Sequence, residues 1–347
     1  MKYPHFTAQD RSLMSKYLTK AVFEELKDKK TANGFTLENI INSGLKNPDS
    51  GIGAYAGDKE SYTTFQSFFD PIIEEYHRFS KEQSHKTDFD IDHLHANNPD
   101  PQDKYIISTR IRVGRNLKDF PLGPAISDQQ REEIQIKIAT ALQSLDGELK
   151  GVYYPLDNLS DHNREELIKD HFLFKEGDRF LQTAGLNRNW PKNRGIFHNN
   201  QKTFLVWVNE EDQLRIISMQ KGGDIKEVFI RLITAIKKLE KTLEFSFSKH
   251  LGYITSCPTN LGTAMRASVH IALPRLANDM TKFQEIADKF HLQIRGTDGE
   301  HTKSTGGVYD ISNKRRLGVT EVQCVQDMYD GVVALIEEEK ALENQFF

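Results

Sequence analysis

Apolar residues in the first eighty positions recur at the spacing of an α-helix. Between residues 13 and 26 the side chains at that spacing are Leu13, Met14, Tyr17, Leu18, Val22 and Leu26, and such a pattern predicts one buried helix face. We expect this helix to begin at Thr7, whose hydroxyl can pair with Asp10 three residues later.

Two more helices are predicted before residue 80. One extends from Thr36 to about Gly44, and the other carries an apolar stripe over residues 62–76, formed by Tyr62, Phe65, Phe69, Ile73 and Tyr76. Residues 1–80 are therefore predicted to form a helical N-terminal domain. Residues 81–104 turn polar and contain HLHANNPDP, a composition typical of a linker, so the domain boundary is placed there.

Strand patterns appear after the linker. TFLVWV and LRIISMQ are separated by the five residues Asn209 to Gln213, which predicts an antiparallel hairpin. ASVHIALP and HLQIRG are further strand candidates. Two long helices are predicted between and after these strands, capped by Asp224 with Glu227 and by Thr320 with Gln323. Residues 105–347 are thus expected to form a mixed α+β domain.

Composition narrows the functional classes. A chain of 347 residues with 37% hydrophobic residues has enough length and apolar surface for two folded domains. Its net charge of -4 provides no overall basic field for nucleic acid or anionic lipid. No secretory signal or membrane-spanning run is visible, and Cys257 and Cys324 are the only cysteines. We expect a cytoplasmic protein that binds neither nucleic acid nor membrane.

A glycine-containing loop, Gly51-Ile-Gly53-Ala-Tyr-Ala56, matches a dinucleotide-binding fingerprint in spacing only. A Rossmann turn follows a strand and opens a helix, whereas this loop follows a predicted helix end. A surface turn is the simpler interpretation. The alternative is a cradle for an anion such as a carboxylate, formed by the backbone N–H groups of Ser50, Gly51 and Ile52.

Arginines recur beside strands and glycine-rich turns. Arg110 and Arg112, two residues apart, would share one face of a strand and could clamp phosphate oxygens together. Further arginines in such positions are Arg215, Arg266 and Arg295. Neither a P-loop nor a protein-kinase catalytic motif occurs. Phosphate binding, if present, would depend on arginine side chains, although most exposed arginine pairs are only solvated.

Three further residues carry possible chemistry. Cys257 precedes Pro258 and lies two residues before Thr259, whose hydroxyl could donate to a thiolate, although a lone cysteine is usually buried packing. Glu211 and Glu300 lie in predicted turns and would ordinarily be surface charges. Two carboxylates can also hold a guanidinium through paired hydrogen bonds.

Together these segments resemble the phosphagen (guanidino) kinases, and among them those that use arginine. The resemblance covers about residues 5–340 and is carried by NPDSGIGAYAGD, STRIRVGRNL, NRGIFHN, TFLVWVNEEDQLRIISMQKGGD, CPTNLGT and IRGTDGEHTKSTGGVYDISNKRRLG. It implies an α+β fold with a small all-helical N-terminal domain and a larger C-terminal domain with an antiparallel sheet flanked by helices. It also implies reversible phosphoryl transfer from MgATP to a small guanidino compound, with free L-arginine as the expected substrate.

Residue roles follow from the same resemblance. Glu211, Glu300 and the Cys257 thiolate would contact the substrate guanidinium, and Ser50, Gly51, Ile52 and Tyr55 would receive its amino-acid end. The nucleotide phosphates would be bound by Arg110, Arg112, Arg215, Arg266 and Arg295, with Ser108 and His171 lining the site. Asp49 and Arg179 would join the two domains. Magnesium is expected on the ATP phosphates with mostly water ligands, because no carboxylate cage is visible.

Several points stay open at this stage. The segment from Arg295 to Gly307 is expected to close over the reacting groups, while Asp298 stands where related proteins often carry a basic or small residue. The loop before Tyr55 and the aromatic Tyr76 resemble arginine users more than creatine users, yet taurocyamine, glycocyamine and lombricine remain alternatives. A kinase of protein arginines and a silent arginine or nucleotide sensor are further candidates. Both monomers and homodimers fit.

Overall fold

The chain folds into a helical N-terminal part and a larger part that contains a β-sheet. The structure is a computed structural model that describes residues 1–169, 172–296 and 306–344. In these ranges the helices are α1 Leu13–Tyr17, α2 Lys20–Leu26, α3 Leu37–Lys46, α4 Ser61–Thr64, α5 Gln66–His77, α6 Asp128–Gln143, α7 Asp161–Lys169, α8 Arg179–Thr183, α9 Ile225–Leu239, α10 Met280–Lys289 and α11 Glu321–Asn344. The strands are β1 Ile106–Arg115, β2 Gly151–Pro155, β3 Gly195–Asn199, β4 Phe204–Val208, β5 Leu214–Lys221, β6 Phe247–Ser248, β7 Gly252–Tyr253, β8 Met265–Ala272, β9 Leu292–Arg295 and β10 Val308–Asn313.

The predicted start of the first helix at Thr7 is wrong. Thr7 and Asp10 instead close a turn, in which the Asp10 carboxylate accepts the Thr7 N–H at 2.7 Å. Helix α1 begins after Ser12, whose hydroxyl caps it, and the chain leaves the helix again before Thr19 caps α2. The same apolar stripe therefore lies on two short helices, because each hydroxyl satisfies the free N–H groups of a new helix start.

The other two N-terminal helices are found with shifted ends. Thr36 caps α3 in a capping box with Asn39, as predicted, but the helix extends past Gly44 to Lys46. Gly44 is required by packing, since a Cβ there would meet the Gly53 carbonyl oxygen at 2.5 Å. The predicted third helix is divided into α4 and α5 at Phe65, whose φ and ψ of -110° and 31° are not helical.

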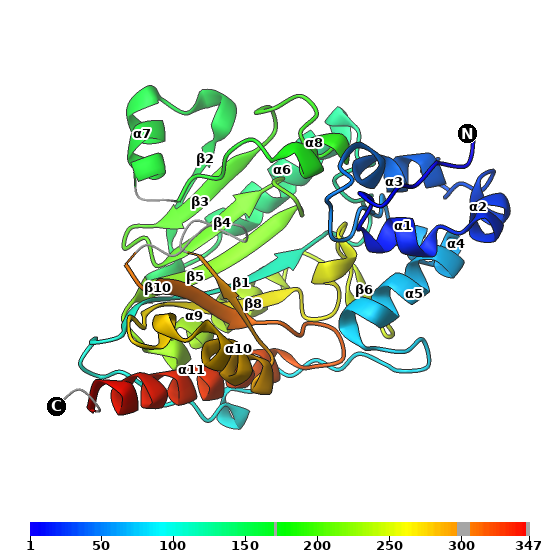
Figure 1. Cartoon of the computed structure of the whole chain (residues 1–347). Helices are drawn as coiled ribbons and strands as arrows, with labels where there is room; N and C mark the ends of the chain where they lie inside the picture. Colours follow the sequence, from blue (N-terminus) through cyan, green and yellow to red (C-terminus); the bar gives the residue numbers. More distant parts are fainter. Residues whose placement is uncertain (170–171, 297–305, 345–347) are drawn as a thin grey trace.

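The larger part is built on one eight-stranded sheet of order β2-β3-β4-β5-β1-β8-β10-β9, with every neighbouring pair antiparallel. The predicted hairpin over β4 and β5 is confirmed. Helices α9 and α11 pack on the sheet, and α10 packs against β9 and α11 (Figure 1). The α+β prediction is therefore confirmed, with the helical N-terminal part beside the sheet (Figure 1).

The two predicted helix caps of this part are also confirmed. The Asp224 carboxylate accepts the Glu227 N–H at 3.1 Å, and the hydroxyl of Thr320 accepts the Gln323 N–H at 3.2 Å. These caps start α9 and α11 beneath the sheet, where alternate apolar strand residues such as Ile111 and Val113 are fully buried in the main core. The opposite face of β1 is left for polar side chains.

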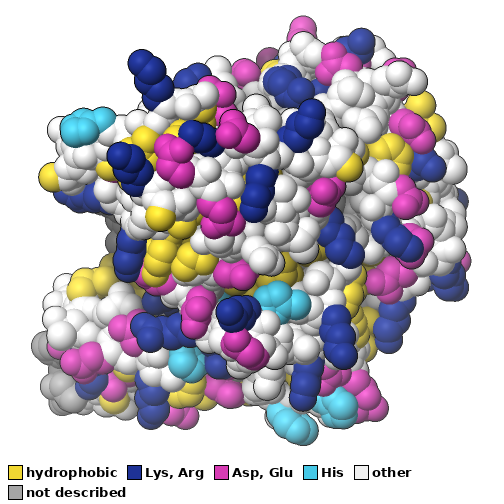
Figure 2. Space-filling view, turned by 90° about the vertical axis from the view of Figure 1, so that its right-hand side faces the viewer, with side chains coloured by type: hydrophobic (Ala, Val, Ile, Leu, Met, Phe, Trp, Pro, Cys, Tyr) yellow, Lys and Arg dark blue, Asp and Glu magenta, His cyan; other side chains and the backbone are white. Residues whose placement is uncertain are grey.

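The surface does not present one sign of charge. On the face seen in Figure 2, basic and acidic side chains are interspersed over the molecule. None of the helices in the part of the chain that the structure describes has the length and apolarity needed to cross a membrane.

Candidate active site

Strand register gathers the predicted arginines on one face of the sheet. Arg110 and Arg112 alternate with buried residues along β1, and Arg112 lies directly opposite Arg266 on β8. Arg215 on β5 lies opposite Gly114 of β1, two residues beyond Arg112. Directly opposite and alternate residues share a face, so these four arginines point to the same side. We call this side the arginine face.

The arginine face continues to the edge of the sheet. His270 follows Arg266 by four residues on β8 and lies opposite Asp310 of β10, which in turn lies opposite Arg295 of β9. Asp310 forms an ion pair with Arg266 at 2.9 Å and lies 3.6 Å from His270. Ser108, also opposite His270, occupies the start of the same face.

Clustered positive charge distinguishes this face. Burial, together with the charges of Arg266 and Arg215, lowers the pKa of Arg110 to about 10. Burial and the charge of Arg215 lower the pKa of Arg112 well below its ordinary value. No hydrogen bond or ion pair joins the Arg112 side chain to another described residue. An anion with several oxygens would relieve this repulsion, and triphosphate is such an anion.

Three neighbours, one aromatic and two acidic, contact the arginines near the hairpin loop. The indole of Trp207, opposite Arg215 in the β4–β5 pair, lies 5.6 Å from the Arg110 guanidinium and 5.4 Å from that of Arg215, measured to the ring centroid. Arg215 also forms ion pairs with Glu210 at 3.0 Å and Glu211 at 3.2 Å. The arginine face thus ends at a pair of carboxylates.

Glu211 lies beside the segment that contains Cys257. The Asn260 side chain, three residues after Cys257, donates to Glu211 Oε1 at 3.4 Å. Cys257 Sγ lies 3.1 Å from the Thr259 hydroxyl oxygen, as the sequence suggested, and its residue is 9% exposed. The Glu211 carboxylate is therefore joined through Asn260 to the segment that contains Cys257, next to Arg215.

Burial sets the protonation of both groups. Burial raises the pKa of Glu211 above its ordinary value against the opposing charge of Arg215. Burial also raises the pKa of the Cys257 thiol, and the nearby Glu211 carboxylate raises it further. The free site therefore favours a neutral thiol, and a bound cation between the two groups would favour the thiolate.

The predicted loop of the N-terminal part is bonded to the segment that contains Cys257. The Ala56 N–H donates to the Ser256 carbonyl at 2.8 Å, which joins the loop to the residue before Cys257. The charges of Cys257 and Glu211 add to burial in raising the pKa of Tyr55, so Tyr55 belongs to the same neighbourhood.

The anion cradle is only partly available. The Ser50 N–H donates to the Asn47 carbonyl at 2.9 Å, so this donor is occupied. The carbonyl oxygens of Gly51 and Ile52 accept from the N–H groups of Leu13 and Met14, each at 2.9 Å. These bonds fix the loop and leave its Gly51 and Ile52 N–H groups as the candidates for a substrate carboxylate.

Asp49 and Arg179 form an ion pair. Arg179 donates from Nη1 to Asp49 Oδ1 at 2.8 Å, from Nη2 to Asp49 Oδ2, and from Nη1 to Asn47 Oδ1 at 3.1 Å. Asn42 beside it donates to the Thr183 carbonyl at 2.6 Å. The end of α3 is thus bonded to α8 of the larger part, while a functional role for the pair stays a prediction.

Three residues named in the sequence analysis lie outside the part of the chain that the structure describes. His171, Asp298 and Glu300 lie outside the described residues, as does most of the segment from Arg295 to Gly307. Within the described ranges no group of three or more His, Cys, Asp or Glu side chains could hold a metal ion.

Sequence analysis missed Glu210, Trp207, His270 and Asp310. The position of His270, four residues after Arg266 in a predicted strand, was an available signal, because such a spacing places both on one face. Trp207 lies opposite Arg215 within the predicted β4–β5 hairpin, so its position was also an available signal. Asp310 faces the arginines only through the pairing of β10 with the distant strand β8, which periodicity does not reveal.

Comparisons with known proteins show similarity over nearly the whole chain. Residues 8–74 match the family model "ATP:guanido phosphotransferase, N-terminal domain", and residues 133–342 match "ATP:guanido phosphotransferase, C-terminal catalytic domain". Arginine kinase of Penaeus monodon is 54% identical over 333 residues, which are 96% of this chain and 94% of that protein. Arginine kinase of Artemia franciscana is 55% identical over 334 residues, covering 95% and 93% of the two chains.

Solved structures are similar over nearly the whole fold. The crystal structure of lombricine kinase has a TM-score of 0.91 at 41% identity and covers 97% of this chain and 94% of that chain. Substrate-free duplicated taurocyamine kinase from Schistosoma mansoni has a TM-score of 0.91 at 45% identity, covering 96% of this chain and 48% of that chain.

Proposed function

This chain belongs to the ATP:guanido phosphotransferase family, and we propose that it reversibly transfers the terminal phosphoryl group of ATP to a guanidino nitrogen of free L-arginine. The products are phosphoarginine and ADP. The observation that supports this most is the contact between the two halves of the site, where Arg215 of the arginine face meets the Glu211 carboxylate at 3.2 Å.

The arginine face binds the nucleotide in this proposal. Phosphoryl transfer asks the protein mainly for alignment and charge neutralisation. Forked guanidiniums on neighbouring strands provide alignment and charge neutralisation together. The proposed phosphate-binding residues are Arg110, Arg112, Arg215, Arg266 and Arg295, with Ser108 and His171 beside them. ATP would carry magnesium on its phosphates with mostly water ligands, and this ion would supply further neutralisation of phosphate charge.

The residues around Glu211 bind and activate the guanidino substrate in this proposal. Glu211, Cys257 and Glu300 hold the guanidinium, while Ser50, Gly51, Ile52 and Tyr55 receive the amino-acid end. One guanidino nitrogen attacks the terminal phosphorus and loses a proton to Glu211, as the bond from phosphorus to the ADP oxygen breaks. The raised pKa of Glu211 suits a general base that must accept this proton.

Two further predicted features would shield and position the reacting groups. Most of the segment from Arg295 to Gly307 lies outside the described residues, and its closure over the reacting groups, which would keep water from hydrolysing ATP, stays a prediction. The Asp49–Arg179 pair holds α3 to α8, so that the loop carrying the substrate carboxylate donors keeps its distance from Glu211.

Free arginine is the preferred acceptor. The two relatives named arginine kinase are 54% and 55% identical to this chain, whereas the structures named lombricine and taurocyamine kinase are 41% and 45% identical. The alternative is a kinase for another small guanidino compound.

A coupled ADP-release assay tests the proposal. The purified chain is given MgATP and, in separate reactions, L-arginine, taurocyamine, glycocyamine, lombricine, creatine and an arginine-rich protein. We expect the highest kcat/KM with L-arginine. A higher value with another compound would overturn the substrate, and nucleotide binding without any turnover would favour a sensor.

A further inference from the structure

The proposed base Glu211 sits in a very short loop whose shape must be fixed. The loop consists of the five residues Asn209 to Gln213 between β4 and β5. Asn209 begins it with a left-handed φ of 57°, and the Asn209 N–H donates to the Gln213 carbonyl at 3.0 Å. A small rotation at the first residue would move every carboxylate that follows.

Asn209 is anchored through its side chain. Both amide hydrogens on Nδ2 are used, one toward the Arg131 carbonyl at 3.2 Å and one toward the Asn193 carbonyl at 2.9 Å. The residue is 4% exposed. An asparagine amide has two N–H donors, so this side chain binds two carbonyls from two distant segments, α6 and the residues before β3.

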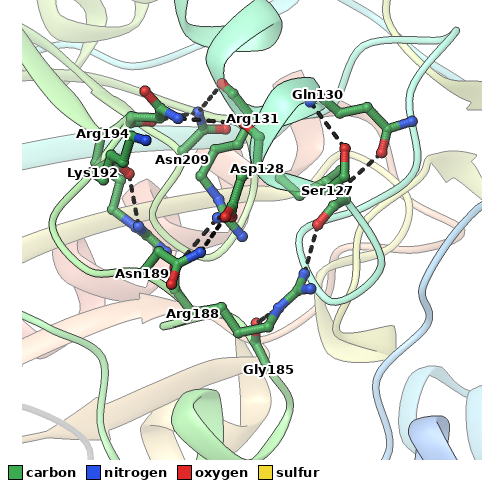
Figure 3. A network of polar contacts seen from close by, with 12 residues as sticks. Ser127, Asp128, Gln130, Arg131, Gly185, Arg188, Asn189, Lys192, Arg194 and Asn209 are labelled. Carbon is green, nitrogen blue, oxygen red and sulfur yellow. Dashed lines mark hydrogen bonds and ion pairs between the residues drawn. The ribbon is translucent and has the colours of Figure 1, made fainter.

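A frame of arginines holds those two carbonyls in place. Arg131 Nη1 donates to Asp128 Oδ1 at 3.1 Å and to the Arg188 carbonyl at 3.3 Å. Arg194 Nη2 donates to the same Arg188 carbonyl at 3.2 Å and to the Leu186 carbonyl at 2.7 Å. Figure 3 shows Asn209 reaching into this network beside Arg131 and Arg194. Arg131 and Arg194 are 2% and 1% exposed, which suits a rigid support.

The frame leaves the loop little room to shift inward. A cavity of about 10 Å³ is lined by Arg131, Asn209 and Leu186 together with the residues from Glu210 to Gln213. This volume holds at most one water molecule. On the other side, Asn116 donates to Asp212 Oδ1 at 2.8 Å and accepts the Gln213 N–H at 2.9 Å. The end of the loop is thus held separately from its start.

We propose that Asn209 is a positioning residue for phosphoryl transfer, because its side-chain amide fixes the start of the loop and thereby the direction of the Glu211 carboxylate. This inference rests on the proposed function, in which Glu211 contacts the guanidinium. Asn209 itself contacts no substrate.

The variant Asn209→Gly tests the inference, since glycine keeps the left-handed φ but removes the amide. In the ADP-release assay with L-arginine we expect kcat to fall about 10²-fold, as for other small misplacements of a reacting group. KM for ATP should change little, because the proposed arginine contacts to phosphate come from β1, β5, β8 and β9 rather than from the loop. If the glycine variant does not fold, Asn209→Asp gives a second test. The carboxylate of aspartate cannot donate hydrogen bonds to the Arg131 and Asn193 carbonyls, so both side-chain bonds are lost.

Asn189→Gly is the matched control, because glycine again keeps the left-handed φ and removes only the side-chain amide. Asn189 also has a left-handed φ of 56° and donates its side-chain amide to Asp128 in the same network, yet it makes no bond to the loop. We expect the kcat of this variant to stay that of the wild type, because Asn189 makes no hydrogen bond to the loop that carries Glu211.

The double variant Asn209→Gly with Glu211→Gln separates positioning from general damage. If Asn209 acts through Glu211, the double variant should lose no more kcat than Glu211→Gln alone. Additive losses, or a wild-type kcat in folded Asn209→Gly, would overturn the inference. Failure of the wild type to phosphorylate arginine in the same assay would instead refute the proposed function.

Discussion

Strand β1 shows two different surfaces on one backbone. Ile111 and Val113 point into the main core and are fully buried, whereas Arg110 and Arg112 point to the opposite face among like charges. The apolar face stabilises the fold by removing surface from water. The lowered pKa values of Arg110 and Arg112 mean that the fold disfavours these charges, so the arginine face costs stability until an anion binds.

This contrast separates residues that hold the fold from residues that perform the reaction. Changes on the arginine face and its hairpin loop should reduce catalysis or nucleotide binding with little loss of stability. Changes on the apolar face should do the reverse. Four substitutions, taken from the largest expected effect to the smallest, test this division.

Glu211→Gln should have the largest effect. We expect kcat to fall by about 10²- to 10⁴-fold, the usual range for loss of a general base. The melting temperature should stay the same or rise, because burial of the carboxylate is unfavourable. Steady-state kinetics and thermal unfolding of the same preparation measure both. Near-full turnover would remove Glu211 from the reaction.

Ile111→Ala tests the other face of β1. Truncating a fully buried isoleucine should lower the free energy of unfolding by about 2–5 kcal/mol, while KM for ATP stays unchanged. Denaturant unfolding with and without nucleotide would measure the loss. A raised KM for ATP at unchanged stability would show that the two faces are not independent.

Arg112→Ala is the counterpart one residue away. Loss of a charge-assisted contact to phosphate, worth about 1.5–3 kcal/mol, should weaken ATP binding about 10- to 100-fold. Without nucleotide the melting temperature should hold or rise, since Arg112 lies among like charges. Calorimetric titration with MgATP gives the affinity. A stability loss equal to that of Ile111→Ala would contradict the division between the faces.

Local sequence patterns predicted the features that depend on residues close together in the chain, namely the two faces of β1, the hairpin and the helix caps. Alternation in STRIRVGR placed Arg110 and Arg112 on one face, and the turn spacing gave the β4–β5 hairpin. The caps at Thr36, Asp224 and Thr320 were found because each forms its bond within three residues. Thr7 failed as a cap because Ser12 and Thr19 offered competing ones.

The remaining features depend on partners far apart in sequence. Asp310 reaches Arg266 only through the pairing of β10 with β8, and no periodicity specifies which strands become neighbours. The approach of Cys257 to Glu211 likewise joins two separate loops. For Cys257 the residue-level expectation was buried packing, and the functional interpretation came from the resemblance to a family.

Asp310→Asn should have the smallest effect and refine the comparison, because Asp310 is a carboxylate within the arginine face. Burial raises the pKa of Asp310, but the neighbouring His270 and the charge of Arg266 outweigh burial and lower it to about 2. A lowered pKa means that the ionised form stabilises the fold. This contribution is complete above the unfolded value of 3.8 and is lost as the pH falls through about 2.

The wild type should therefore exceed Asp310→Asn in stability by about 1–2 kcal/mol near neutral pH, and the difference should shrink between about pH 4 and pH 2. The free energy of unfolding is measured for both proteins across this pH range. The titration of the other carboxylates is common to both proteins and cancels when the two free energies are subtracted. A constant difference at every pH would mean that Asp310 contributes by shape alone. A difference that shrinks as expected would show that the arginine face contains one charge that stabilises the fold before any phosphate binds.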